Sequence, residues 1–166
     1  MFMNLLRVKN NFAICLVLGI LLMGCTPNKY SEYYEKTSNE WMVYLSEISD
    51  KQEWSLNNTV LLVLKSSECT PALSELKRWD TLQTNSDTVK VKLIILERYE
   101  STFNTFLDFQ KITIPAYRDS QSVITSHKLL PHTPMKVLIG KNGKVIKLGA
   151  INSRGNEMAF LSQLKN

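Results

Sequence analysis

The amino-acid sequence predicts an α/β domain with a central mixed sheet, helices on both of its faces and a β-hairpin near the C-terminus. Residues 59–64 form a continuous apolar run, which suits a strand buried on both faces. Strand and helix patterns alternate after this run, which indicates parallel pairing through crossover connections. Asn142-Gly143 then separates two further apolar strand patterns and is a strong hairpin signal.

The elements are justified in order along the chain by their apolar spacing. In residues 26–50, Tyr34, Trp41, Leu45 and Ile48 share one helical face, so we expect a short tether followed by a helix. After the central strand, Pro71 suits the first turn of a helix. The remaining patterns predict a helix at 71–82, a strand at 89–96, a helix at 101–110, an extended piece at 114–117, a helix at 121–130, strands at 135–139 and 144–148, and a helix at 156–164.

The start of the chain has the order of a secretion signal. Arg7 and Lys9 precede an apolar run at residues 12–23, which is shorter than the roughly twenty residues that span a bilayer. Residues 22–25, Leu-Met-Gly-Cys, resemble the lipobox of bacterial lipoproteins. The resemblance implies cleavage after residue 24 and a lipid on the Cys25 sulfur. The alternative is an ordinary signal peptide with an incidental cysteine.

These features divide the chain into three parts. We expect a signal peptide at 1–24, a lipidated Cys25 with tether and helix at 25–57, and one domain at 58–166. Loss of the two basic leader residues lowers the net charge of +5 by two, and a balance this mild gives no reason to expect a nucleic-acid partner.

The cysteines leave one free thiol. Cys15 is lost with the leader and Cys25 is lipidated, so Cys69 has no partner for an intramolecular disulfide. In an exported, oxidising compartment a lone thiol needs an explanation, either burial or chemistry.

Two motifs stand in fixed relation to the predicted elements. Residues 69–72, Cys-Thr-Pro-Ala, join the central strand to the next helix, and Thr133-Pro134 directly precedes the hairpin. With Glu75-Leu76, Trp79 and the hairpin itself, they resemble the thioredoxin fold and, more narrowly, TlpA-type membrane-anchored thiol-disulfide oxidoreductases. The similarity covers residues 59–164.

The resemblance implies a three-layer thioredoxin-like fold with Cys69 as nucleophile and Pro134 in the cis form. It also implies that Thr70, Pro71 and Thr133 contact the substrate. Independently of the family, a cysteine at the first turn of a helix faces unpaired N–H groups that stabilise a thiolate. An extended edge beside the sulfur could pair with an incoming peptide by strand addition.

The sequence departs from the family at two positions. Ala72 stands where a dithiol enzyme has the cysteine that resolves the mixed disulfide, so turnover by two internal thiols is excluded. Glu68 precedes Cys69, and its negative charge opposes thiolate formation, partly offsetting the helix dipole.

Three hypotheses for function follow. In the first, Cys69 is a monothiol that exchanges with exported protein thiols or disulfides, and an external thiol reductant resolves the adduct. In the second, the chain is a non-catalytic module that binds an extended peptide or partner protein, and the thiol is incidental. A separate alternative for Cys69 itself is an inert, buried thiol, because free cysteine is among the most buried residue types. The third, a peroxidase of the peroxiredoxin type, lacks support because Leu62 and Ser66 occupy the positions of its Pro-x-x-x-Thr pattern.

No cofactor or metal site is expected. His127 and His132 lack the spacing of metal ligands and are interpreted as solvated loop residues. The membrane is contacted through the lipid on Cys25, and we expect the domain to lie in the cell envelope, facing the periplasm.

Overall fold

The computed structural model describes residues 33, 38–48, 55–84, 90–152 and 157–165. These belong to a structural unit that spans Glu32–Asn166. The second unit, Met1–Ser31, lies outside the described residues, and so do the predicted signal peptide, Cys25 and the predicted helix position Tyr34.

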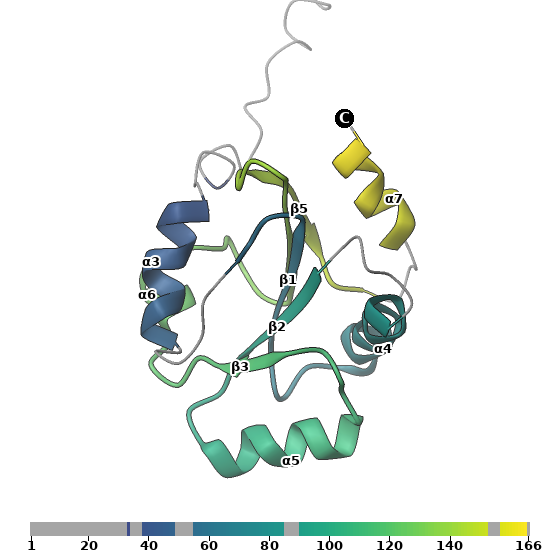
Figure 1. Ribbon diagram of the computed structural model, residues 1–166. Helices are drawn as coiled ribbons and strands as arrows, with labels where there is room; N and C mark the ends of the chain where they lie inside the picture. Colours follow the sequence, from purple (N-terminus) through teal and green to yellow (C-terminus); the bar gives the residue numbers. More distant parts are fainter. Residues whose placement is uncertain (1–32, 34–37, 49–54, 85–89, 153–156, 166) are drawn as a thin grey trace, which may run out of the picture. The chain divides into compact units, whose positions relative to one another are not determined.

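Five strands form one mixed sheet in the order β3-β2-β1-β4-β5 (Figure 1). Strands β2 and β3 continue the sheet in parallel on one side of β1, whereas β4 and β5 form the antiparallel hairpin on the other side. The central position of β1 explains its continuous apolar run, because both of its faces are covered. The strand bounds are β1 (Thr59–Lys65), β2 (Lys90–Leu96), β3 (Ala116–Arg118), β4 (Met135–Ile139) and β5 (Val145–Ala150).

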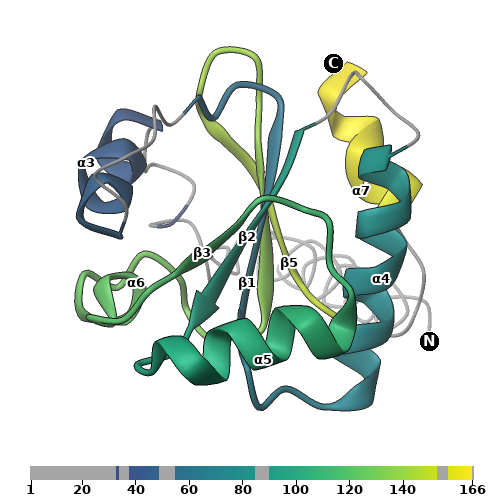
Figure 2. The ribbon, with the colours of Figure 1, turned by 60° about the horizontal axis from the view of Figure 1, so that its bottom comes forward.

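Helices cover both faces of the sheet, as the sequence predicts. Figure 1 shows α3 and α6 on one side and α4 and α7 on the other, and Figure 2 shows α5 crossing near the end of the strands. The helix bounds are α3 (Ser38–Ile48), α4 (Thr70–Thr84), α5 (Glu100–Gln110), α6 (Val123–Ser126) and α7 (Glu157–Leu161), followed by the 3-10 turn η1 (Ser162–Lys165).

One face of the sheet packs against α4, α5 and α7. Alternate residues of β1 point to this side and meet the buried residues Leu76 and Trp79 of α4, Phe106 of α5 and Phe160 of α7. The ring of Trp79 meets Phe160 edge to face at 6.2 Å between centroids. Leu76 and Trp79, which lie three residues apart in the predicted helix, therefore both belong to the buried face of α4.

The opposite face packs against α3 and α6. Leu61 and Val63 of β1 point away from α4 because side chains alternate along a strand. Trp41 and Leu45, which the sequence predicts on one helical face, are 1% and 0% exposed. They fix α3 to the domain.

Three predicted elements differ from the observed ones. The helix predicted at 121–130 is α6, which is only four residues long because Lys128 has a left-handed φ of 48° and the chain turns there. The extended piece predicted at 114–117 pairs as β3 over Ala116–Arg118. Phe109, an apolar residue of the helix predicted at 101–110, is 79% exposed and faces away from the core.

The hairpin turn follows from its glycine. Gly143 has a φ of 75°, in the left-handed region that favours glycine, and the Gly140 N–H donates to the Lys144 carbonyl at 2.9 Å. Lys144 therefore belongs to the turn, and β5 begins one residue later than predicted. Within the described part of the chain, no helix combines the length and apolar character needed to cross a bilayer.

Candidate functional site

Cys69 occupies the N-cap position of α4. Its carbonyl accepts hydrogen bonds from the N–H groups of Ala72 at 3.0 Å and Leu73 at 3.3 Å, which closes the first turn of the helix. Cys69 is a free cysteine and is exposed. This exposure contradicts the alternative of an inert, buried thiol, and it leaves the side chain accessible to a reagent or a partner.

The first turn of α4 places its residues in two environments. Thr70 and Pro71 are exposed beside Cys69. Ala72 is 1% exposed and belongs to the core cluster around Leu76 and Trp79. The position where a dithiol enzyme has its second cysteine therefore points inward here and holds only a methyl group.

Thr133 and Pro134 lie at the same end of the sheet as Cys69. Met135, the first residue of β4, pairs with Val63 near the end of β1, and β1 leads directly into the Cys69 turn. The Thr133–Pro134 peptide bond is cis. The fold thus brings the two predicted motifs to the same end of adjacent strands, and Thr133 and Pro134 are both half-buried.

The turn between β1 and Cys69 is tied to the end of β2. The Ser66 hydroxyl donates a hydrogen bond to the Glu97 carboxylate, which also accepts from the Tyr99 N–H at 3.0 Å. These donors, the Ser66 hydroxyl first, lower the pKa of Glu97 below its ordinary value. The Ser66 hydroxyl donates its hydrogen bond to Glu97 and not to Cys69. This arrangement gives no support to the peroxidase hypothesis, in which a hydroxyl at this position would act together with the cysteine.

Glu68 makes only a marginal local contact. The Lys65 N–H donates to Glu68 Oε1 at 3.5 Å, the outer limit for a hydrogen bond. The carboxylate is therefore turned towards the preceding residues of its own turn. The Glu68 N–H in turn donates to the Lys65 carbonyl at 3.2 Å, so the segment before Cys69 is a closed turn.

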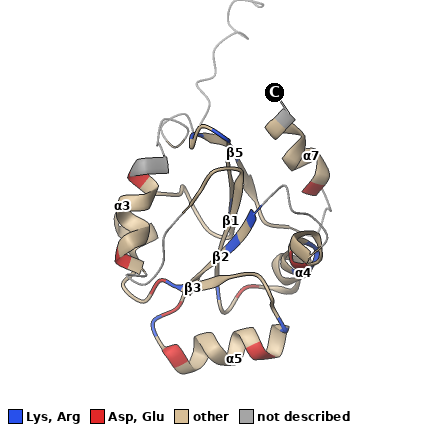
Figure 3. Cartoon of the chain, viewed as in Figure 1, with Lys and Arg blue, Asp and Glu red and all other residues tan. Residues whose placement is uncertain are grey.

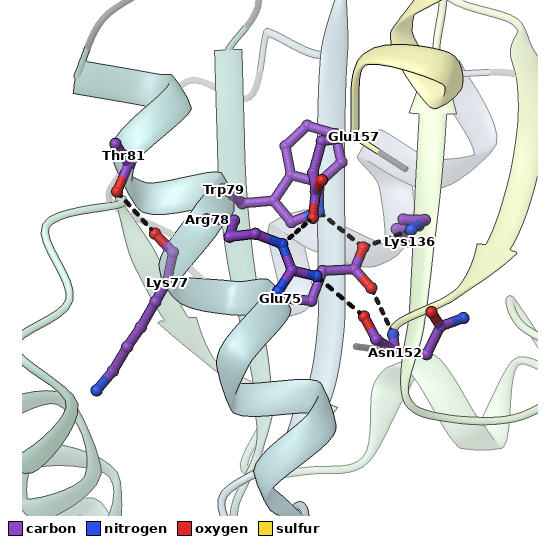
Figure 4. Close-up of polar contacts among 8 residues, drawn as sticks. All are labelled: Glu75, Lys77, Arg78, Trp79, Thr81, Lys136, Asn152 and Glu157. Atoms are coloured by element: carbon purple, nitrogen blue, oxygen red, sulfur yellow. Dashed lines mark hydrogen bonds and ion pairs between the residues drawn. The ribbon is translucent and has the colours of Figure 1, made fainter. Parts of the chain in front are cut away.

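A buried ionic group joins the two halves of the site. Glu75, six residues after Cys69 on α4, receives a hydrogen bond from the ammonium group of Lys136, two residues after Pro134 on β4 (Figure 4). Their side chains are 1% and 7% exposed. Burial of a charge is unfavourable unless it is paired, and here each ion neutralises the other.

Two further donors bind the Glu75 carboxylate. Trp79 Nε1 donates to Glu75 Oε1 at 3.0 Å, and the Asn152 N–H donates to Glu75 Oε2 (Figure 4). The Lys136 ammonium group also lies 5.1 Å from the centre of the Phe160 ring, which gives it a cation–π contact. Neither the family resemblance nor the apolar spacing predicts that Glu75 pairs with Lys136.

A second ion pair extends the network to α7. Arg78 Nε lies 2.6 Å from Glu157 Oε1, and Arg78 also donates to the Asn152 carbonyl at 3.2 Å. Asn152 thus connects the two ion pairs through its backbone, since its N–H binds Glu75. The network joins α4, β4 and α7.

The two histidines have different surroundings. His127 stacks on Tyr44 with 4.2 Å between ring centroids, and its Nε2 lies 3.8 Å from Glu47 Oε2, so it joins the α6 end to α3. This contact was missed by the interpretation of His127 as a solvated loop residue. His132 is exposed. Among the described residues, no three of His, Cys, Asp and Glu lie close enough to bind a metal ion together.

Comparison with known proteins gives similarity in structure alone. No family model matches the chain, and no curated protein matches its sequence. A Chlorobium tepidum protein assigned provisionally as thiol:disulfide interchange protein DsbE has a TM-score of 0.57 and 17% identity over 64% of this chain and 77% of its own.

Two further solved structures show the same similarity. A thiol-disulfide isomerase from Corynebacterium glutamicum has a TM-score of 0.55 and 16% identity over 70% of this chain and 90% of its own. StoA from Bacillus subtilis has a TM-score of 0.51 and 20% identity over 63% of this chain and 80% of its own. The predicted thioredoxin-like fold is therefore confirmed: the chain has the fold seen in structures of thiol-disulfide oxidoreductases.

Proposed function

We propose that this chain is an exported, lipid-anchored thioredoxin-like protein that carries out monothiol-disulfide exchange through Cys69. The observation that supports this function is the exposed Cys69 at the N-cap of α4, at the same sheet end as the Thr133–Pro134 edge. The structural similarity to thiol-disulfide oxidoreductases is consistent with redox exchange.

The exchange proceeds in balanced steps. The Cys69 thiolate attacks one sulfur of a partner's disulfide, forming a mixed disulfide and releasing the partner's other sulfur as a thiolate, which takes up a proton. An external thiolate then attacks the Cys69 sulfur, which releases the reduced partner. A second external thiolate attacks this new disulfide, returns Cys69 to the thiolate and leaves the external reductant as its disulfide.

The residues around Cys69 have separate roles in this proposal. Thr70, Pro71 and Thr133 contact the polypeptide that bears the disulfide, and Pro134 holds the edge against which it lies. Ala72 cannot resolve the mixed disulfide, so the external thiol is required. The proposal needs no cofactor.

In this proposal the chain has three parts, each with its own role. Residues 1–24 are a signal peptide, residues 25–57 hold the lipidated Cys25, the tether and α3, and residues 58–166 form the thioredoxin-like domain. The TlpA-type lipoproteins are the relatives that this arrangement resembles. The domain then faces the periplasm, held at the membrane by Cys25.

Ala72 favours a second candidate function. In this alternative, the surface at the Cys69 and Pro134 end binds an extended peptide without chemistry, because no internal thiol can release a covalent adduct. The two functions differ in one outcome. The substitution Cys69→Ala abolishes exchange in the first and leaves partner binding unchanged in the second.

The alkylation rate of Cys69 against pH tests the first function. The mature lipidated protein in detergent is compared with the same protein in denaturant, whose thiol ionises near the reference value of about 8.5. A folded-state rate that saturates at lower pH supports exchange, and Glu68→Gln should shift the profile further in that direction. A thiol that reacts only after denaturation would rule exchange out.

The lipid anchor is tested separately. Mass spectrometry of the mature N-terminus should show Cys25 with its lipid as the first residue, and the Cys25→Ala variant should lose it. An unmodified mature N-terminus at another position would disprove the anchor while leaving the thiol chemistry open to the alkylation test.

A further inference from the structure

The end of the sheet opposite Cys69 is basic. Lys141 and Lys144 are exposed in the β4–β5 turn, and Lys90 is exposed at the start of β2. Thr59, at the start of β1, pairs with Lys90 on one side and Ile139 on the other, so all three lysines lie at one end of the strands. Figure 3 shows lysines at this turn.

The other end of the sheet has mixed charge. The residues that follow the parallel strands combine acidic with basic groups, including the ion pair between Arg118 and Glu100 at 3.7 Å. The charged residues there are Lys65, Glu68, Glu97, Arg98, Glu100 and Arg118. The described strand ends and turns around these lysines, residues 55–59, 90 and 139–145, contain no acidic residue, so the two ends of the sheet differ in charge.

The chain enters the domain on the side of the basic end. Glu47, in the last turn of α3, lies beside His127, in the segment that leads to Pro134. Because α3 runs from Ser38 to Ile48, its first residue lies at the helix end away from this contact and from the segment that leads to Pro134. Residues 26–37 separate Ser38 from Cys25, and an extended chain of this length spans at most roughly 45 Å.

These features point to one partner for the basic end. We infer that Lys90, Lys141 and Lys144 face the anionic phospholipid headgroups of the bilayer that holds Cys25, with Cys69 and Pro134 directed away from the membrane. This inference rests on the proposed lipid anchor. A tether alone lets the domain rotate, whereas lysines within a Debye length of an anionic surface are attracted to it and favour one orientation.

Energy transfer to the bilayer measures this orientation. Mature lipidated protein is reconstituted in vesicles of phosphatidylcholine with phosphatidylglycerol and an acceptor dye on headgroups. A donor dye is attached either to native Cys69 or to Asn57→Cys in a Cys69→Ala background. Asn57 is exposed and lies two residues before the start of β1, at the basic end. Transfer from position 57 should exceed transfer from position 69 by about twofold or more, and high salt or pure phosphatidylcholine should remove the difference.

Charge reversal identifies the residues responsible. The triple variant Lys90→Glu, Lys141→Glu, Lys144→Glu should abolish the difference between the two probes. The matched triple variant Lys65→Glu, Lys77→Glu, Arg98→Glu changes the charge equally at exposed positions away from the basic end and should preserve it. Circular dichroism confirms that each variant is folded before reconstitution.

Flotation of the same vesicles separates the anchor from the orientation. If the protein floats with both vesicle types but the two probes give equal transfer, the inference is wrong and the anchor stands. If the protein does not float with pure phosphatidylcholine vesicles, the anchor is wrong and the inference fails with it.

Discussion

The ammonium group of Lys136 donates a hydrogen bond to the carboxylate of Glu75 inside the core. Because Lys136 follows Pro134 on β4 and Glu75 follows Cys69 on α4, this ion pair fixes the strand and the helix of the candidate site to each other. Both ions are buried, so the pair stabilises the domain only while it is complete.

Removal of one partner of this pair should be strongly destabilising. Lys136→Met leaves Glu75 as an unpaired buried charge and should lower the free energy of unfolding by about 3–5 kcal/mol. Adding Glu75→Gln removes that charge and keeps one acceptor oxygen, which can serve either Trp79 or Asn152, so the double variant should recover at least about 1–2 kcal/mol. Urea unfolding measures each value.

A matched control is the exposed pair of Arg118 and Glu100, whose Glu100 side chain is 74% exposed. Glu100→Gln should change the free energy of unfolding by less than about 0.5–1 kcal/mol. If the losses from Lys136→Met and Glu75→Gln simply add in the double variant, Glu75 and Lys136 are not coupled in the folded protein.

The bond between Ser66 and Glu97 should make stability depend on pH. Donation from Ser66 holds the pKa of Glu97 below its ordinary value of 4.5. The ionised Glu97 carboxylate therefore stabilises the folded state at pH values above 4.5. This stabilisation is lost as the pH falls through the lower pKa of the folded state. Ser66→Ala should reduce the difference in unfolding free energy between about pH 7 and about pH 3.

Urea unfolding at both pH values checks this difference, with Ser101→Ala as the control because Ser101 is an exposed serine of α5. The wild type and Ser66→Ala should converge in acid, where Glu97 is protonated in both. If Ser66→Ala lowers the free energy of unfolding equally at both pH values, the Ser66 hydroxyl stabilises the fold independently of the charge on Glu97.

The stacked rings of Tyr44 and His127 should contribute to the attachment of α3. His127→Ala removes the ring and should lower the free energy of unfolding by at most about 1 kcal/mol, because His127 is partly exposed. His127→Phe keeps a ring over Tyr44 and should cost less. Faster hydrogen exchange in α3 of the alanine variant, and not of the phenylalanine variant, would locate the effect.

A cysteine at position 72 should convert the site into a dithiol site. Ala72 lies one turn into α4 from Cys69, and Ala72→Cys supplies a thiol that can attack a mixed disulfide at position 69. Catalysed reduction of insulin by dithiothreitol should rise by about tenfold or more over the wild type. Ser74→Cys places a thiol elsewhere on the same helix, and if it raises the rate equally, position 72 has no special role.

The sequence was most informative where local patterns decide the structure. The apolar run at 59–64 identified β1, and the spacing of Leu76 and Trp79 identified α4, because a buried strand and an amphipathic helix have distinct periods. The change from the strand period to the helix period also located the turn between β1 and α4, and with it Cys69 at the start of α4. Asn142-Gly143 located the hairpin because the turn needs a left-handed residue, which Gly143 supplies.

Contacts between distant residues could not be predicted in this way. Lys136 and Glu75 are 61 positions apart, and an acidic residue within a helix is by default assigned to solvent. The ring contact between Tyr44 and His127 likewise depends on how α3 packs. The start of α6, by contrast, is fixed by a local contact, since the buried Asp119 carboxylate accepts from the Val123 and Ile124 N–H groups at 2.8 and 3.0 Å.

The strand order has a consequence for biosynthesis. The two neighbours of β1 lie far apart in the sequence, because Thr59 pairs with both Lys90 and Ile139. Such non-local pairing raises the contact order and slows folding. A nascent chain that stops before β4 leaves one edge of β1 open beside the apolar residues Leu61 and Val63, which favours aggregation. We therefore expect the C-terminal hairpin to be required for β1 to be fully paired, and truncations upstream of Met135 to yield insoluble fragments rather than a smaller folded domain.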